Sequence, residues 1–438
     1  MDLKGKRLLV IGGSSASVDV IKNAQAMGVY VVVADQSNRG VGYKMADEAV
    51  QVSTTDFDGL ERVVKEKNID GIFCGPSEFN LFNTMKLCER VGLPFYANEK
   101  LWNQCADKLQ FRDFCIRNGL DVAAEYHIDE NTDFDTLTGV EYPVIIKPVD
   151  GCSSKGISVC NSNSELKGAY SKAKELSASG KVIVEQYINT NGRGFSFRYF
   201  ISDGKAYPYL LLDTFIADPV RRKCLVSAFA YAPSELTQEF MDTVDANMRK
   251  VIADMGIKNG TVFIQALPHK GKFYCHDMGY RLSGGMLYKM TEPLIGVNDM
   301  KMMIRYALGG QICEAEDIEK LEKINSISTV TAQVMLPLDV GTITTINGWD
   351  KICAMPEVVD VLQYYNVGDI IDESVIGTLG QHFARVTLAA EDKDVILEKV
   401  KYIEDNFSVK DEQGREIHTM RFDVQRMCEC EQNVKFGG

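Results

Sequence analysis

The chain has 438 residues, 45% of them apolar and 25% charged, a composition typical of a globular protein with more than one domain. Its net charge of −13 argues against a general nucleic-acid or anionic-membrane surface, because such a surface needs a concentrated basic face. The sequence contains no apolar run long enough to span a membrane and no apolar signal core, so we expect a cytoplasmic protein.

The twelve cysteines are scattered and stand mostly alone within apolar segments. Examples are Cys74, Cys88, Cys115 and Cys353. This pattern predicts reduced core thiols in a reducing compartment. Cys428 and Cys430 lie close together, but without a second pair nearby they do not indicate a zinc site.

Apolar runs alternate with helical patterns in the first part of the chain. The runs cover residues 7–12, 29–34 and 71–74, and a helical pattern covers residues 16–27. Alternation of this kind predicts a parallel sheet in a doubly wound α/β domain.

A dinucleotide site is an alternative for this domain, because Asp35 ends the second run where a ribose-binding acid would lie. The glycine pattern disfavours it, since Gly12 and Gly13 are followed by no third glycine at the start of the helix. We therefore expect the domain to bind something smaller than a dinucleotide, or nothing.

Helix is predicted around residues 98–118, where Ala106-Asp107-Lys108 opens a helix that ends at Gly119. The segment YPVIIKPVDGCSSKGISVC follows at residues 142–160. In this segment an apolar run ends at Lys147, and a loop rich in glycine and serine, Asp150 to Gly156, leads into a second apolar run. Such a loop can bring backbone N–H groups and hydroxyls close to a polyphosphate, while the lysine supplies a positive charge. The alternative is a plain hairpin with a flexible tip.

The next elements are a helix, a strand, a long helix and four strands joined in pairs by short turns. The first helix covers Ser164 to Ser179 with Ser164 as N-cap, and the strand after it covers 181–185. The strands 194–202 and 206–213 are joined by the turn Asp203-Gly204, and the strands 261–267 and 272–278 by the turn Lys270-Gly271. The long helix, 234–255, lies between the two pairs of strands. The last hundred or so residues read as a further α+β portion.

The sequence leaves the roles of two segments undecided. The segment 213–231 carries Arg221, Arg222 and Lys223, which could cap an active site and meet an anionic substrate or could be a solvated loop. The helix predicted at 298–308 has methionines and isoleucine on one face, which indicates core or subunit packing, and a homodimer is the usual closed form.

Five segments, taken in order, resemble the ATP-grasp superfamily, in particular its carboxylate-amine ligases such as L-amino acid ligases, biotin carboxylase and the large subunit of carbamoyl phosphate synthase. They are DKLQFRDFC at Lys108, the Lys147 hairpin, VEQYI at 184–188, HDMGYRLSGG at 276–285 and GVNDMKMMIRYALGG at 296–310. The resemblance runs from the first strand to about residue 400.

This resemblance implies a mixed α/β and α+β chain with an ATP-grasp fold. Its parts would be an N-terminal Rossmann-like pre-ATP-grasp domain at 1–97, a central subdomain at 98–188, a nucleotide- and metal-binding subdomain at 189–330, and a C-terminal α+β portion at 331–438.

The resemblance also implies a set of site residues. Lys108 and Lys147 would contact the phosphates, Glu185 would bond the adenine or ribose side, and the backbone at 186–188 would read the adenine edge. The implied ATP-binding set is Lys108, Lys147, Gly151, Ser153, Ser154, Gly156, Glu185, Gln186, Tyr187 and Ile188. The catalytic residues implied are Arg281 and Lys147, the metal ligands Asp277 and Gln265, and the substrate residues Glu78, Arg281, Ser283 and Gly284.

Three positions depart from the family pattern, which has glutamate at 265, asparagine at 279 and a further glutamate at 194. This chain has Gln265, Gly279 and Gly194 there, so metal binding would be weaker or rearranged. Two assignments also have ordinary structural alternatives: Asp277 as a charge at a strand end, and Glu78 as a first-turn acid after an N-cap, Ser77.

The function implied is an ATP-dependent ligase that activates a small carboxylate as an acyl phosphate and joins it to an amine or similar nucleophile, with Mg²⁺ or Mn²⁺. The main alternative, motivated by the departures at 194, 265 and 279, is an ATP-binding protein without ligation that serves a regulatory or partner-binding role. A nicotinamide-dependent oxidoreductase rests only on the first 35 residues.

Overall fold

The computed structural model describes residues 1–438 except 151–155, 219–223, 325–326, 426 and 428–438. Some predicted residues lie outside these described ranges: Gly151, Ser153, Ser154, Arg221, Arg222, Lys223, Cys428 and Cys430. In the part of the chain that is described, no helix has the length and apolar character needed to cross a membrane.

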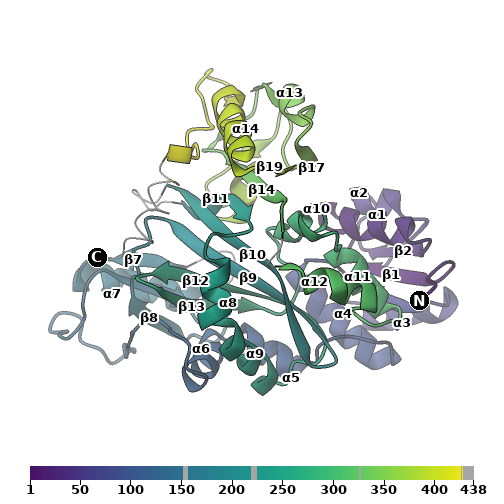
Figure 1. Cartoon of the computed structure of the whole chain (residues 1–438), viewed down its shortest axis with the longest axis horizontal. Helices are drawn as coiled ribbons and strands as arrows, with labels where there is room; N and C mark the ends of the chain where they lie inside the picture. Colours follow the sequence, from purple (N-terminus) through teal and green to yellow (C-terminus); the bar gives the residue numbers. More distant parts are fainter. Residues whose placement is uncertain (151–155, 219–223, 325–326, 426, 428–438) are drawn as a thin grey trace.

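The N-terminal part is a four-stranded parallel sheet in the order β3-β2-β1-β4 with helices on its faces, as predicted (Figure 1). Its elements are β1 (Arg7–Ile11), α1 (Val18–Ala26), β2 (Tyr30–Asp35), α2 (Val41–Met45), β3 (Glu48–Gln51), α3 (Phe57–Glu66), β4 (Gly71–Phe73) and α4 (Glu78–Val91). The short edge strand β3 was not predicted, because Glu48 and Gln51 interrupt its apolar pattern. Asp35 accepts hydrogen bonds from the N–H groups of Gly13 (2.7 Å) and Ser37 (2.8 Å), so its carboxylate holds the first loop.

The helical segment predicted at 98–118 forms two helices, α5 (Glu99–Ala106) and α6 (Lys108–Arg117), and α6 is the helix predicted to open at residues 106–108. Asp107 separates them and caps α6, because its carboxylate accepts from the N–H groups of Leu109 and Gln110 at 2.9 and 3.1 Å. This cap fixes Lys108 as the first residue of α6.

The predicted hairpin belongs to a second, antiparallel sheet in the order β5-β8-β6-β7. The strands are β5 (Glu125–Tyr126), β6 (Val144–Pro148), β7 (Ser158–Cys160) and β8 (Val182–Gln186), and α7 (Asn163–Leu176) covers them (Figure 1). Helix α7 begins and ends earlier than the predicted range 164–179. Its N-cap is Ser162, which accepts from the Glu165 N–H at 3.3 Å, and its last residue is Leu176.

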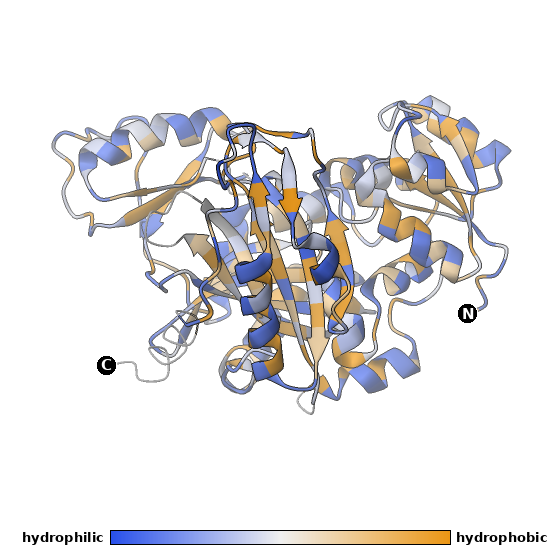
Figure 2. Ribbon diagram, turned by 90° about the horizontal axis from the view of Figure 1, so that it is seen from above, coloured by the Kyte–Doolittle hydropathy of each residue, from blue (hydrophilic) through white to orange (hydrophobic). Residues whose placement is uncertain are grey.

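An eight-stranded antiparallel sheet forms the centre of the molecule, in the order β13-β12-β9-β10-β11-β14-β19-β17. Its strands are β9 (Arg193–Ser202), β10 (Lys205–Asp218), β11 (Cys224–Ala232), β12 (Gly260–His269), β13 (Lys272–Gly279), β14 (Val330–Pro337), β17 (Val358–Gln363) and β19 (His382–Ala390). Apolar residues dominate these central strands, whereas the helices around them have polar outer faces (Figure 2). Strands before and after residue 330 belong to this one sheet. The boundary predicted between the parts 189–330 and 331–438 therefore runs through the sheet and not between two separate sheets.

Both predicted hairpin turns are confirmed. Asp203 and Gly204 have φ of 52° and 82°, and Lys270 and Gly271 have φ of 50° and 71°, the left-handed pair that a tight two-residue turn requires. The segment 213–231 is largely strand, since β10 continues beyond Asp213 and pairs with β11. The long helix predicted at 234–255 breaks at Val244 into α8 (Thr237–Thr243) and α9 (Asp245–Asp254).

The remaining elements connect the sheets or complete the C-terminal part. They are η1 (Ser15–Ser17), η2 (Leu287–Met290), α10 (Thr291–Ile295), α11 (Asp299–Ala307), α12 (Ala315–Leu321), β15 (Gly341–Thr342), β16 (Thr345–Asn347), α13 (Trp349–Cys353), β18 (Ile370–Ile371), η4 (Leu379–Gln381), α14 (Lys393–Asn406) and β20 (Ser408–Lys410). The methionine-rich α11 buries Met300, Met302 and Met303 in the core, so its apolar face serves core packing. Cys353 is exposed, and its prediction as a core thiol was wrong.

Asp299, the first residue of α11, is an acid in the core with 1% of its surface exposed. Burial raises its pKa to about 7, against the opposing effects of the Tyr209 hydroxyl and Arg198. Because the folded-state pKa lies above the unfolded value of about 4, the contribution of this group to stability is fully present below pH 4 and is lost as the pH rises through 7.

We expect Asp299→Asn to gain stability relative to the parent protein as the pH rises from 5 to 8, by about 1–3 kcal/mol. Urea unfolding at both pH values measures this change. The exposed α8 residue Asp242 supplies a matched control, Asp242→Asn, whose effect should not depend on pH in this range. An equal effect of Asp299→Asn at both pH values would contradict the raised pKa.

Candidate nucleotide and acyl-activation site

A buried ion pair joins the two inner strands of the hairpin sheet. Lys147 on β6 and Glu185 on β8 are diagonal neighbours on one face of the sheet, because Lys147 pairs with Ile183 and Glu185 pairs with Ile145. Lys147 Nζ lies 2.7 Å from Glu185 Oε2, and each side chain is only 6% exposed. The structure therefore confirms that Lys147 is buried and gives it a carboxylate partner that the sequence did not reveal.

Arg112 on α6 extends this pair into a network. Its Nη1 donates to Glu185 Oε1 at 3.2 Å and its Nε lies 3.1 Å from Glu125 Oε2. Arg112 was missed from the sequence because its role depends on the packing of α6 against a strand 73 positions further along the chain. Glu185 is thus held by two cations before any ligand binds.

Lys108 brings the central sheet into the same cluster. Its Nζ lies 3.2 Å from Asp277 Oδ1 on β13, and its side chain is 13% exposed. Two lysines predicted to contact phosphates and one acid predicted to hold a metal therefore come together where α6 and the hairpin sheet meet β13.

His276 lies among these charged groups and was also missed. Burial and the charge of Lys147 lower its pKa to about 4, Lys108 acts in the same direction, and Asp277 and Glu185 act against them. The imidazole is consequently neutral at pH 7. A register shift in the β12–β13 pairing, where Gln265 faces Asp277 but Ala266 faces Cys275, leaves His276 as the extra residue of a bulge.

The predicted metal ligands Asp277 and Gln265 lie opposite each other on β13 and β12. Asp277 is 31% exposed, and Gln265 is exposed. In the part of the chain that the structure describes, no group of three or more histidine, cysteine or acidic side chains could enclose a metal ion. One carboxylate and one amide oxygen fit a Mg²⁺ ion that takes its remaining ligands from water and phosphate oxygens, the usual arrangement for this ion with nucleotides.

The predicted adenine segment is partly occupied by the sheet. The N–H groups of Gln186 and Tyr187 donate to the carbonyls of Ala124 (2.8 Å) and Pro143 (3.1 Å). Those two N–H groups are therefore unavailable to a base, which narrows the predicted backbone contacts to the carbonyls of Gln186 and Tyr187 and the peptide groups of Ile188. The roles of these residues toward adenine stay predictions.

Gly156 closes the predicted phosphate loop. Its φ is +77°, and a Cβ atom there would lie 2.8 Å from Pro148 Cγ at the end of β6. Both the backbone conformation and the contact require glycine.

Glu78 and Arg281 form an ion pair across the interface between the N-terminal domain and the central sheet. Arg281 Nη2 donates to Glu78 Oε2 at 2.9 Å, and its Nη1 donates to the Leu282 carbonyl at 3.0 Å. Glu78 also stands in the first turn of α4, where Ser77 is the N-cap. The two interpretations of Glu78 are thus compatible.

Residues 283 and 284, predicted to contact substrate, are held by two arginines that the sequence did not single out. Arg198 on β9 donates from Nη1 to the Ser283 hydroxyl at 3.1 Å, and Arg385 on β19 donates from Nη1 to the Gly284 carbonyl at 2.9 Å. The segment 281–284 is consequently fixed from three directions.

The departure at position 279 has a steric cause. A Cβ atom at Gly279 would overlap the ring of Phe263, which faces it on β12 and lies beneath the guanidinium groups of Arg198 (5.7 Å) and Arg281 (5.5 Å). Phe263 therefore fills the space that a longer side chain at 279 would occupy. At Gly194 a Cβ atom would meet the Thr214 hydroxyl at 2.6 Å.

We expect Gly279→Ala to destabilise the protein by about 1–3 kcal/mol, the usual cost of overpacking, as measured by urea unfolding. The double variant Gly279→Ala/Phe263→Leu should be less destabilised than the sum of the two single variants, because the smaller side chain removes the overlap. Additive effects would show that Phe263 is not the cause.

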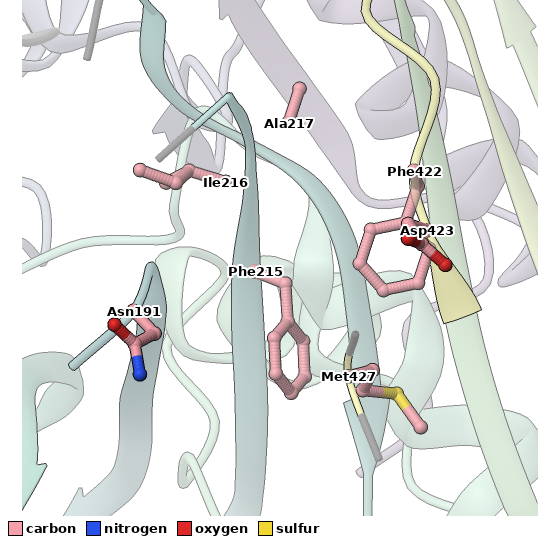
Figure 3. A pocket seen from close by; sticks show the side chains of 7 residues that line it. All are labelled: Asn191, Phe215, Ile216, Ala217, Phe422, Asp423 and Met427. Carbon is pink, nitrogen blue, oxygen red and sulfur yellow. The ribbon is translucent and has the colours of Figure 1, made fainter. Parts of the chain in front are cut away.

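A small cavity lies elsewhere in the described part of the chain. Figure 3 shows its lining from β10 and the C-terminal segment, with Phe215 pointing toward Met427. Its lining residues are Asn191, Phe215, Ile216, Ala217, Phe422, Asp423 and Met427. None of them belongs to the charged cluster, and the lining is largely apolar, so we assign the chemistry to the cluster.

Comparison with known proteins agrees with this geometry. The family described as ATP-grasp domain matches residues 140–275, which contain Lys147, Glu185 and Gln265. A formate-dependent phosphoribosylglycinamide formyltransferase of Sulfurisphaera tokodaii is 22% identical over 325 residues, covering 69% of this chain and 76% of the relative.

Two solved structures are similar over nearly the whole chain. The L-amino acid ligase from Bacillus licheniformis superposes with a TM-score of 0.75 at 18% identity, covering 93% of this chain and 99% of that one. The biotin carboxylase domain of 2-oxoglutarate carboxylase from Hydrogenobacter thermophilus, in complex with MgADP, ADP and bicarbonate, gives a TM-score of 0.74 at 18% identity and covers 98% of each chain. The fold is therefore an ATP-grasp fold.

Proposed function

We propose that this protein is an ATP-dependent ligase that activates a small carboxylate as an acyl phosphate and transfers the acyl group to an amine or related nucleophile, releasing ADP and phosphate. The observation that carries the proposal is the meeting of Lys147, Lys108 and Asp277 where the hairpin sheet packs on the central sheet. Phosphoryl transfer needs mainly positioning and charge neutralisation, which these groups supply.

The residues divide the reaction between them. Lys147 and Lys108 bind the phosphates, with Lys108 leaving Asp277 to do so, and Arg281 holds the carboxylate that attacks the γ-phosphate. Asp277 and Gln265 hold Mg²⁺ together with phosphate oxygens, and the ion supplies charge neutralisation at the transferring phosphoryl group. The nucleophile then displaces phosphate from the acyl phosphate, and Glu78 faces the side from which it approaches. No side-chain nucleophile takes part.

ADP release measures the activity. Purified protein with Mg²⁺, ATP and a panel of acids and amines should release ADP only when both substrates are present, and Asp277→Ala should lower the rate by about 100-fold or more. Asp254→Ala, at the exposed end of α9, is a matched control and should keep the parent rate. A parental rate in Asp277→Ala would refute the role of Asp277.

A second candidate function, ATP binding without ligation, is favoured by the single carboxylate in the metal shell. Calorimetry would then detect Mg²⁺–ATP binding while no acid and amine pair stimulates ADP release. The same two measurements separate the candidates.

A further inference from the structure

Three arginines from separate strands or strand ends converge on three consecutive residues. Arg281 donates to the Leu282 carbonyl (3.0 Å), Arg198 to the Ser283 hydroxyl (3.1 Å) and Arg385 to the Gly284 carbonyl (2.9 Å). Arg198 and Arg385 are 2% and 3% exposed. Such a concentration of buried positive charge requires negative partners.

Two of the three cations have an acidic neighbour. Arg281 pairs with Glu78 at 2.9 Å, and Arg198 lies near enough to Asp299 to lower its pKa. Lys289, close by on η2, bridges Asp19 and Asp360 at 3.0 Å each.

Arg385 is different. Among the described residues no acid lies within ion-pair distance of it, while its Nε, like the Nε atoms of Arg198 and Arg281, is buried without a hydrogen-bond partner. Burial lowers the pKa of Arg385, and the groups that oppose this effect are the phenols of Tyr364 and Tyr288, which are neutral at pH 7.

Holding one carbonyl does not account for a buried guanidinium, because a neutral amide could donate the same bond without the desolvation cost. The glycines beside it point to a ligand. A Cβ atom at Gly284 would meet nothing closer than Leu379 Cδ1 at 3.8 Å, and one at Gly285 nothing closer than Leu287 Cγ at 3.8 Å. Neither glycine has the left-handed φ that would require it, and a Cβ atom at either position would make only an ordinary van der Waals contact, so packing within the protein does not explain the two glycines.

We propose that Arg385 and Arg281 form a two-point anion site over residues 282–285, and that a substrate bound there carries a second anionic group, carboxylate or phosphate, in addition to the reacting carboxylate. The inference rests on the proposed ligase function for the identity of the reacting group. The Cα atoms of Leu282 and Gly284 are at most about 7 Å apart, so a small molecule can reach both arginines.

Calorimetry with the full chain, ADP and Mg²⁺ tests the site with two four-carbon probes, succinate and butyrate. Succinate should bind at least about tenfold more tightly than butyrate, as a charge-assisted hydrogen bond provides, and Arg385→Gln should remove that preference. Arg305→Gln is the matched control, because Arg305 also donates to a backbone carbonyl, Gln311 O, but is paired with Asp317 and lies away from the site. Absence of a preference, or its persistence in Arg385→Gln, overturns the proposal.

A stability measurement separates ligand binding from a structural role. Arg385→Met should unfold at the same temperature as the parent protein or higher, since it removes an unpaired buried charge, while losing succinate binding. Arg385→Lys keeps the charge and should retain part of the preference for succinate over butyrate. This variant tests the site if Arg385→Gln does not fold. A lower unfolding temperature for Arg385→Met with unchanged succinate binding would make Arg385 structural and overturn the proposal.

ADP-release assays locate the second anionic group. With one amine mixture, dicarboxylic acids are compared with monocarboxylic acids, and with one acid mixture, acidic or phosphorylated amines are compared with neutral ones. A preference in either series that disappears in Arg385→Gln supports the site and assigns the group to the acid or to the amine. ADP release that ignores the second charge overturns the anion site and leaves the ligase proposal intact. If succinate binds but no acid and amine pair stimulates ADP release, the anion site is supported and the ligase proposal is overturned.

Discussion

Replacing Lys147 by methionine should reduce ATP-dependent ADP release by about 100-fold or more and destabilise the protein by about 2–4 kcal/mol. We expect the activity to fall because the variant loses a buried positive charge that, in the proposed function, binds the phosphates. The stability falls because Glu185, 6% exposed, then keeps Arg112 at 3.2 Å as its one cationic partner among the described residues. Urea unfolding and ADP release measure the two effects separately.

The exposed pair Lys272–Asp121 is a matched control for this prediction. Its N–O distance is also 2.7 Å, but the side chains are 54% and 39% exposed. Lys272→Met should therefore lose only a small fraction of the stability lost in Lys147→Met and should retain full activity.

The double variant Lys147→Met/Glu185→Gln separates charge burial from catalysis. It removes both members of the pair and should regain part of the stability without regaining activity. If Lys147→Met and Lys272→Met cost the same stability, the buried network would not be what holds the hairpin sheet to α6.

Local sequence signals were enough to predict the elements that carry the site. Two apolar runs on either side of the glycine-rich loop after Lys147 predict a hairpin, and the structure pairs them as β6 and β7. Asp203-Gly204 and Lys270-Gly271 predict tight turns, because both residues of each pair can adopt a positive φ. By contrast, the break at Val244 and the cap at Ser162 depend on one or two residues within otherwise helical patterns.

The partners within the site could not be predicted in the same way. Arg281 and Glu78 are 203 positions apart, and Arg385 and Gly284 are 101 apart. The second contact depends on the order of strands in the central sheet, which places β19 beside β14, and the first depends on the packing of α4 near the end of β13. No periodicity in the sequence encodes either arrangement. A buried arginine such as Arg385 gives no sequence signal, because arginine is usually exposed.

Replacing Arg281 by alanine should reduce the rate of ADP release at saturating substrates by about 100- to 1,000-fold while leaving nucleotide affinity unchanged. Arg281 contacts Glu78 and the Leu282 carbonyl, whereas Lys147 pairs with Glu185, and in the proposed function Arg281 holds the reacting carboxylate and not the nucleotide. The loss should therefore appear in turnover, and calorimetry with ADP should show parental binding.

Two further variants show what the guanidinium of Arg281 contributes. Arg281→Lys keeps the charge but loses the planar fork, so it should fall between the parent protein and Arg281→Ala. Glu78→Gln keeps Arg281 and removes the carboxylate that holds it at 2.9 Å, which should raise the KM for the amine more than it lowers kcat. If Arg281→Ala weakens ADP binding as strongly as it slows turnover, Arg281 acts on the nucleotide, and the division of the site into a phosphate side at Lys147 and an acyl side at Arg281 is wrong.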